Sequence, residues 1–104
     1  MSTQQNARFL VLDAMNGPFG GQILRLRLQS GEAPSIRSLK GARLAGRGPR
    51  GETATVRVKG FPTFGGKPSD ARFSRTGRVD VHVTPEEGSP SPVGLQWEVG
   101  VAAG

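Results

Sequence analysis

The strongest constraint on the fold is a repeated alternation of apolar and polar residues in short runs. In GGQILRLRLQSG, residues 20–31, Leu24, Leu26 and Leu28 face one way, while Arg25, Arg27 and Gln29 face the other. A period of two residues is typical of a β-strand, because successive side chains of a strand point to opposite faces. The same alternation recurs in ETATVRVKG, residues 52–60, and in GRVDVHV, residues 77–83. We therefore expect strands with one buried and one solvated face.

Two shorter runs outside these segments predict two further strands. RFLVLDA, residues 8–14, is almost continuously apolar and predicts a first strand buried on both sides. ARLAG, residues 42–46, predicts a short strand that RGPRG joins to residues 52–60 in a hairpin. GEAPSIRSLKG, residues 31–41, carries turn signals and room for one helical turn after Ser35. With 16 Gly and 8 Pro in 104 residues, helices are disfavoured elsewhere.

The C-terminal part leaves two alternatives open. We divide the chain into a frayed N-terminus (1–6), a barrel domain (7–84), a Pro/Ser/Gly-rich linker (85–94) and a C-terminal segment (95–104). In LQWEVGV, the residues Leu95, Trp97, Val99 and Val101 alternate with polar or small ones. Residues 95–101 are either a last strand that closes the sheet or a flexible tail that places Trp97 on another molecule.

Six short strands separated by turns indicate an all-β barrel or sandwich. We favour a small six-stranded β-barrel, because closure removes exposed edges from a sheet too small to hide them.

With the strands placed, the chain resembles the second domain of the translational GTPases, the β-barrel shared by elongation and initiation factors. The matching stretches, within residues 8–83, are FLVLDAMNGPFGGQILRLRLQSG, LKGARLAGRGPRGETATVRVKGFPTF and ARFSRTGRVDVHV. Arg78 stands where that family usually has an acidic residue after the glycine. No G-x-x-x-x-G-K-[ST] motif occurs, so the resemblance does not extend to GTP hydrolysis.

Two phenylalanines in KGFPTFGGKPSD, residues 59–70, have alternative roles. The resemblance implies that Phe61 and Phe64 are apolar residues that cover a barrel end. The alternative is an exposed pair that stacks on a partner.

The residue types needed for catalysis are scarce. The chain has no Cys and one His, so it has neither a thiolate site nor a histidine-rich metal site, and we expect no metal or other cofactor. Asp80, His82 and Ser74 form a conceivable hydrolytic triad, but Asp80 and His82 are more simply a surface pair on one strand. We expect a protein that is not an enzyme. No N-terminal targeting signal or run of about 18 apolar residues occurs, which predicts a cytoplasmic protein without membrane association.

The remaining signal is positive charge. Residues 8–83 contain all 14 Lys and Arg but only five of the 8 acidic residues. Such a field attracts polyanions. The predicted outward positions on the strands hold five cations: Arg25, Arg27, Arg57, Lys59 and Arg78. Three more, Arg43, Arg47 and Arg50, lie around the expected hairpin end.

These cations lead to two functional hypotheses. The first is a barrel that binds RNA or a ribonucleoprotein through the five outward cations. Backbone binding is favoured over sequence reading, because KGFPTF does not reproduce the aromatic core of an RNA-recognition motif. The competing interpretation is a solvated basic face that only keeps the barrel soluble. The second hypothesis is a protein-interaction module that uses a barrel edge or Trp97. The sequence does not define an oligomeric state.

Overall fold

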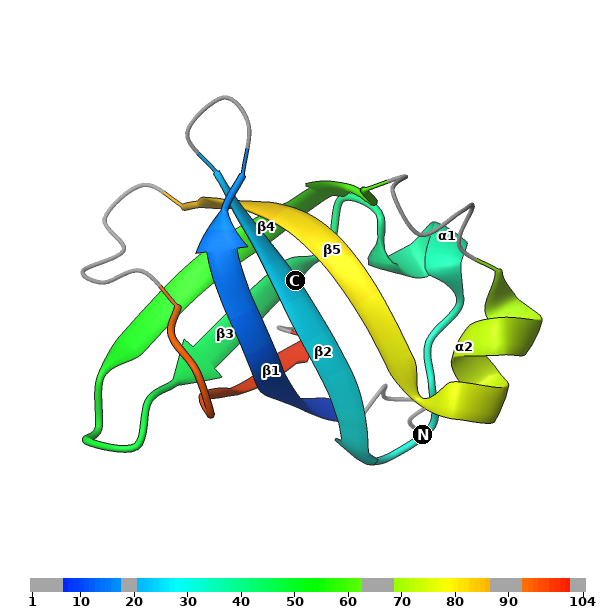
Figure 1. The fold of residues 1–104 in the computed structure, drawn as a ribbon, viewed down its shortest axis with the longest axis horizontal. Coiled ribbons are helices and arrows are strands. Elements are labelled where there is room, and N and C mark those ends of the chain that lie inside the picture. The colour runs from blue at the N-terminus through cyan, green and yellow to red at the C-terminus, as the bar shows by residue number, and fades with distance from the viewer. Residues whose placement is uncertain (1–6, 18–20, 63–68, 87–92, 102–104) are drawn as a thin grey trace, which may run out of the picture.

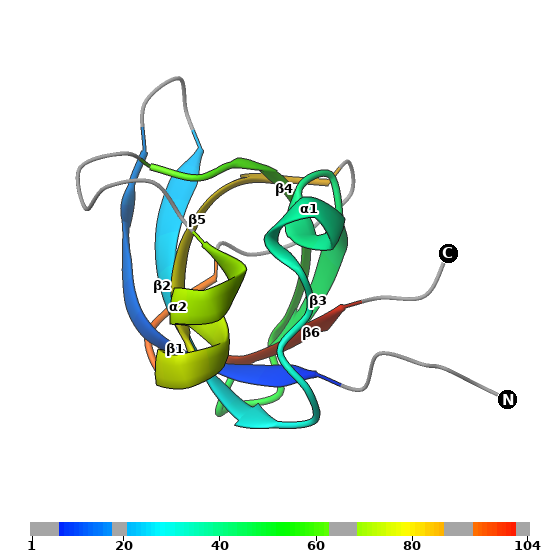
Figure 2. The same cartoon turned by 90° about the vertical axis from the view of Figure 1, so that its right-hand side faces the viewer.

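The computed structural model describes residues 7–17, 21–62, 69–86 and 93–101. Six antiparallel strands close into a barrel, and two short helices lie across one of its ends (Figures 1 and 2). This confirms the predicted six-stranded β-barrel. In chain order the elements are β1 (Arg8–Asn16), β2 (Gln22–Ser30), α1 (Ile36–Leu39), β3 (Arg43–Arg47), β4 (Thr53–Gly60), α2 (Asp70–Thr76), β5 (Arg78–Pro85) and β6 (Glu98–Val101).

The strand order around the barrel is β1-β2-β5-β4-β3-β6, and β6 pairs back to β1. Strands β3, β4 and β5 are sequential neighbours, and β6 returns beside β3, which is a Greek-key arrangement. Each strand therefore has a hydrogen-bonded neighbour on both sides.

The alternation seen in the sequence forms the core. Leu24 and Leu26 on β2 are fully buried and lie opposite Val81 and Val79 on β5. On β4 the buried residues are Ala54, Val56 and Val58. On β1, Phe9 and Val11 are buried, but Leu10 and Leu12 are only half-buried. The prediction that the first strand is buried on both sides is wrong, because Leu10 lies in register with Arg27 and Glu98 on the outer face.

Helix α2 was not predicted, and it closes the barrel end. Its buried residue Phe73 stacks on Phe9, with ring centroids 6.1 Å apart. The helix begins where the Ser69 hydroxyl accepts a hydrogen bond from the Arg72 amide, and it ends at Gly77, which has φ 70°.

Helix α1 is the expected turn after Ser35. Its Leu39 is buried in the same core as Phe9 and Phe73. The Ser35 hydroxyl caps it by accepting from the Ser38 amide. The two helices are joined directly, since the Asp70 carboxylate accepts a 2.6 Å hydrogen bond from the Ile36 amide.

The C-terminal segment completes the barrel through β6. Trp97 is 5% exposed and packs against glycines: a Cβ at Gly46 would lie 3.3 Å from its ring, and a Cβ at Gly94 would lie 3.1 Å from its Nε1. The Trp97 carbonyl accepts from the Val11 amide at 2.9 Å, which anchors this segment to β1. Val93 is also buried and exchanges two hydrogen bonds with the Gln22 side chain.

Leu95 belongs to the same alternating run as Trp97 but does not face the core, since its side chain is 58% exposed. The chain turns at Gln96, which has φ 64°, so regular alternation begins only at Glu98.

Of the two phenylalanines with alternative roles, Phe61 is half-buried and packs on the core. Phe64 and the N-terminal residues 1–6 lie outside the described residues. Neither helix in the described part of the chain is long and apolar enough to cross a membrane.

Candidate nucleic-acid interface

Arg25 lies on the outer face of β2, and its charge is offset by acidic neighbours. Its Nε lies 3.2 Å from Asp80 Oδ1 on β5, and Asp13 on β1 lies opposite it in register. The hydrogen bond from Arg25 to Asp80 raises the pKa of the guanidinium further. Arg25 is therefore committed to an ion pair within the barrel wall.

Arg57 on β4 is also paired. Its Nη2 and the Nε of Arg43, its partner in register on β3, both lie 3.1 Å from Glu86 Oε1. The Arg57 hydrogen bond, followed by the charge of Arg57 and then the contact with Arg43, lowers the pKa of Glu86. One carboxylate thus bridges two arginines that would otherwise repel each other across the strands. Lys59 is exposed and lies at an irregularity in the β4–β5 pairing.

Arg27 and Arg78 form the second pair of arginines that face each other in register, across β2 and β5. Both are exposed, and no acid in the described part of the chain lies within ion-pair distance of either. Like charges directly opposite on a sheet are destabilising. Glu86 bridges Arg43 and Arg57, whereas no described acid bridges Arg27 and Arg78.

Two further arginines come from α2, the helix that leads into β5. Arg72 and Arg75 are exposed and three residues apart, which places them on one side of the helix. Figure 1 shows α2 next to the start of β5 and the end of β2. We call Arg27, Arg72, Arg75 and Arg78 the basic cluster. Sequence reasoning missed the two helical members, although Ser69 and Gly77 mark the start and end of a two-turn helix.

The structure therefore distributes the five predicted binding residues unevenly. Arg27 and Arg78 are brought face to face, Arg25 and Arg57 are paired with acids, and Lys59 stands apart on β4. Trp97, the predicted partner-binding residue, is buried in the core.

Asp80 and His82 have different neighbours. The Asp80 carboxylate binds Arg25, while His82 packs against the β1–β2 hairpin, where a Cβ at Gly17 would lie 3.1 Å from the imidazole. His82 Nε2 is buried with no hydrogen-bond partner among the described residues. Within those residues, no three potential metal-ligating side chains cluster together.

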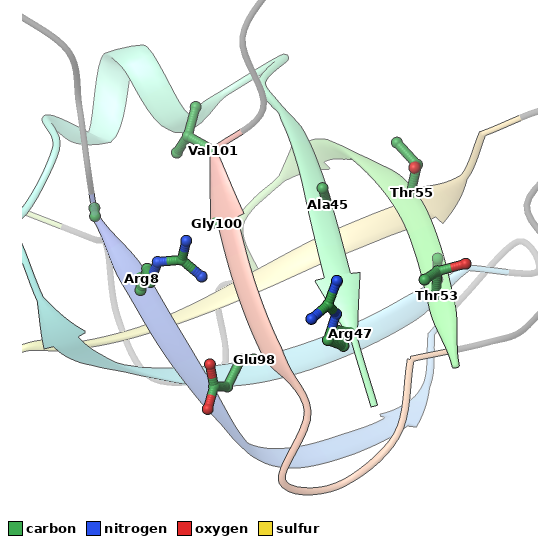
Figure 3. Close-up of a pocket in the computed structure, with 11 residues that line it drawn as sticks. Arg8, Ala45, Arg47, Thr53, Thr55, Glu98, Gly100 and Val101 are labelled. Carbon is green, nitrogen blue, oxygen red and sulfur yellow. The ribbon is translucent and has the colours of Figure 1, made fainter. Parts of the chain in front are cut away.

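A separate hollow of about 540 Å³ lies over β6 on the outside of the barrel (Figure 3). Its floor includes Gly100 on β6 and Ala45 on β3. Arg8 on β1 and Arg47 on β3 flank the stretch of β6 between Gly100 and Glu98. Among the described residues, neither Arg8 nor Arg47 has an ion-pair partner.

Comparison with known proteins identifies no relative: no protein family, curated protein or solved structure matches this chain.

Proposed function

We propose that this protein is a small non-enzymatic β-barrel that binds RNA, free or within a ribonucleoprotein, by its phosphate backbone. The observation that carries the proposal is the opposition of Arg27 and Arg78 across β2 and β5, with no bridging acid among the described residues. A phosphate between the two guanidinium groups would replace their repulsion by two charge-assisted contacts, each able to be bidentate.

The other members of the basic cluster favour contact with several successive phosphates. Arg72 and Arg75 lie on α2, six and three residues before Arg78, and we infer that they supply two further phosphate contacts beside those of Arg27 and Arg78. Among the described residues the exposed large apolar side chains are Met15 and Leu95, and neither belongs to the cluster. Because base recognition in single strands relies on stacking side chains, this composition favours backbone binding.

The resemblance to the second domain of the translational GTPases fits this proposal. We infer a barrel of that kind, which would meet an RNA-rich partner. The protein-interaction alternative has less support, since Trp97 is buried and each strand is paired on both sides.

Fluorescence anisotropy with labelled single-stranded RNA tests the proposal. The variant R27Q/R78Q should bind at least about tenfold more weakly than the unmodified protein, because it loses two charged contacts. The matched control R25Q/D80N removes two charged side chains from the same strands without changing net charge. It should keep the affinity within about threefold. Absence of RNA binding by the unmodified protein, or equal loss in both variants, would refute the basic cluster as the interface.

A further inference from the structure

The hollow over β6 is built from two rows of outward positions that cross the barrel wall. In register, the rows are Arg8, Gly100, Ala45 and Thr55, and Glu98, Arg47 and Thr53. The strands that flank β6 are about 10 Å apart, since neighbouring strands are separated by about 4.8 Å. Arginine side chains from both flanks can therefore reach one group held above β6.

The charges in the hollow are not satisfied internally. Arg47 lies opposite Glu98 in register, yet neither Arg47 nor Arg8 has an ion-pair partner among the described residues. Two cations and one carboxylate therefore face an open space. Elsewhere on the same barrel the acids Asp80 and Glu86 are within 3.2 Å of their arginines.

The glycine in the floor is not required by a positive φ. A Cβ at Gly100 would meet only the Ala7 carbonyl, at 3.4 Å, which is an ordinary contact. By contrast, a Cβ at Gly46 would press on Val99 at 3.1 Å. Glycine inside a strand weakens it and often marks a place where a ligand approaches the backbone.

From these features we propose that the hollow binds a small sugar phosphate, either free or as part of a mononucleotide. The phosphate binds Arg8 and Arg47 above Gly100. Glu98 accepts hydrogen bonds from the sugar hydroxyls, and Thr53 lies at the far wall. The carboxylate would oppose a bare phosphate, but it suits a ligand that carries hydroxyl donors beside its anion. The hollow's volume lies in the usual range for small-molecule sites, about 300 to 1,000 Å³.

This site is distinct from the basic cluster. The floor of the hollow, on β6 and β3, lies across the barrel from β5 and β2 in the strand order, while its Arg8 lies on β1 beside β2. The two proposals can therefore fail independently.

Amide chemical shifts recorded during a titration with ribose 5-phosphate test the proposal, with inorganic phosphate and ribose as separate probes. Ribose 5-phosphate should shift the amides of Arg8, Ala45, Glu98 and Gly100 and should bind more tightly than inorganic phosphate. The variant R8Q/R47Q should lose at least about tenfold in affinity. R72Q/R78Q, with the same loss of charge on α2 and β5, should bind ribose 5-phosphate as the unmodified protein does, because β5 lies across the barrel from β6.

Two further variants separate the roles of space and charge. G100V keeps every charge but fills the floor, so it should fold and lose the ligand. E98Q should bind inorganic phosphate at least as tightly as before but should lose the preference for ribose 5-phosphate. If adenosine 5′-monophosphate binds about tenfold more tightly than ribose 5-phosphate, the ligand is a nucleotide. If the two bind with equal affinity, the ligand is a free sugar phosphate.

Three results would overturn the proposal. The first is that ribose 5-phosphate shifts no amide signals of the hollow. The second is that ribose 5-phosphate still binds to both R8Q/R47Q and G100V. The third is that inorganic phosphate and ribose 5-phosphate bind with equal affinity.

Discussion

Replacing Trp97 by alanine should remove a large part of the barrel's stability. The side chain is 5% exposed and packs in a niche lined by Gly46, Gly48 and Gly94. An aromatic residue of this size buries about 200 Å². At about 25 cal/mol per Å² this corresponds to about 5 kcal/mol, and measured losses for Trp to Ala in cores are about 3 to 5 kcal/mol.

Such a loss is comparable with the whole free energy of unfolding of a domain this size, about 5 to 15 kcal/mol. Urea unfolding followed by far-ultraviolet circular dichroism measures it, since the chain has one Trp and the variant loses its fluorescence. An unchanged m-value would show that the unfolded states are comparable.

The neighbouring substitution L95A is the matched control. Leu95 shows the same alternation in the sequence but is 58% exposed, so its loss should change stability by no more than about 0.5 kcal/mol. If W97A costs less than about 1 kcal/mol, or if L95A costs as much as W97A, residues 95–101 do not close the barrel as described.

Three further changes test individual contacts. G46A should cost about 1 to 3 kcal/mol in urea unfolding, because its Cβ would lie 3.1 Å from Val99 Cγ1; an unchanged midpoint would contradict the packing. G77A should cost about 1 kcal/mol of thermal stability, since Gly77 ends α2 with φ 70°; a stabilised variant would contradict this. The lowered pKa of Glu86 means that its stabilisation is complete above the unfolded pKa, about 4.3, and is lost as pH falls through the folded value. Unfolding at several pH values should therefore show E86Q less stable than the unmodified protein at neutral pH, with the difference disappearing in acid.

The strands could be predicted because their alternation is local. Leu24 and Leu26 on one side and Arg25 and Arg27 on the other follow from the period of two, whatever the partner strand is. Helix α2 was missed because two turns carry little periodicity, and its stability depends on Phe73 packing against Phe9, 64 residues away in sequence. The exposure of Leu95 could not be predicted for a similar reason, since the turn at Gln96 interrupts an alternation that continues in the sequence.

The candidate interface depends on register, which the sequence does not reveal. Arg25 and Arg27 look equivalent in the sequence, but one lies opposite Asp80 and the other opposite Arg78. The hollow is still harder to predict from the sequence, because Arg8, Arg47 and Gly100 come together only when β6 pairs with both β1 and β3.

The salt dependence of RNA binding tests the central claim most directly. If four arginines of the basic cluster each neutralise one phosphate, the slope of log K against log salt is about −2.8, and affinity falls about 50-fold between roughly 50 and 200 mM salt. For R27Q/R78Q the slope should decrease to about −1.4, a fall of about sevenfold over the same range. An RNA affinity that is insensitive to salt, or a slope that is the same in the variant, would contradict phosphate binding by Arg27 and Arg78.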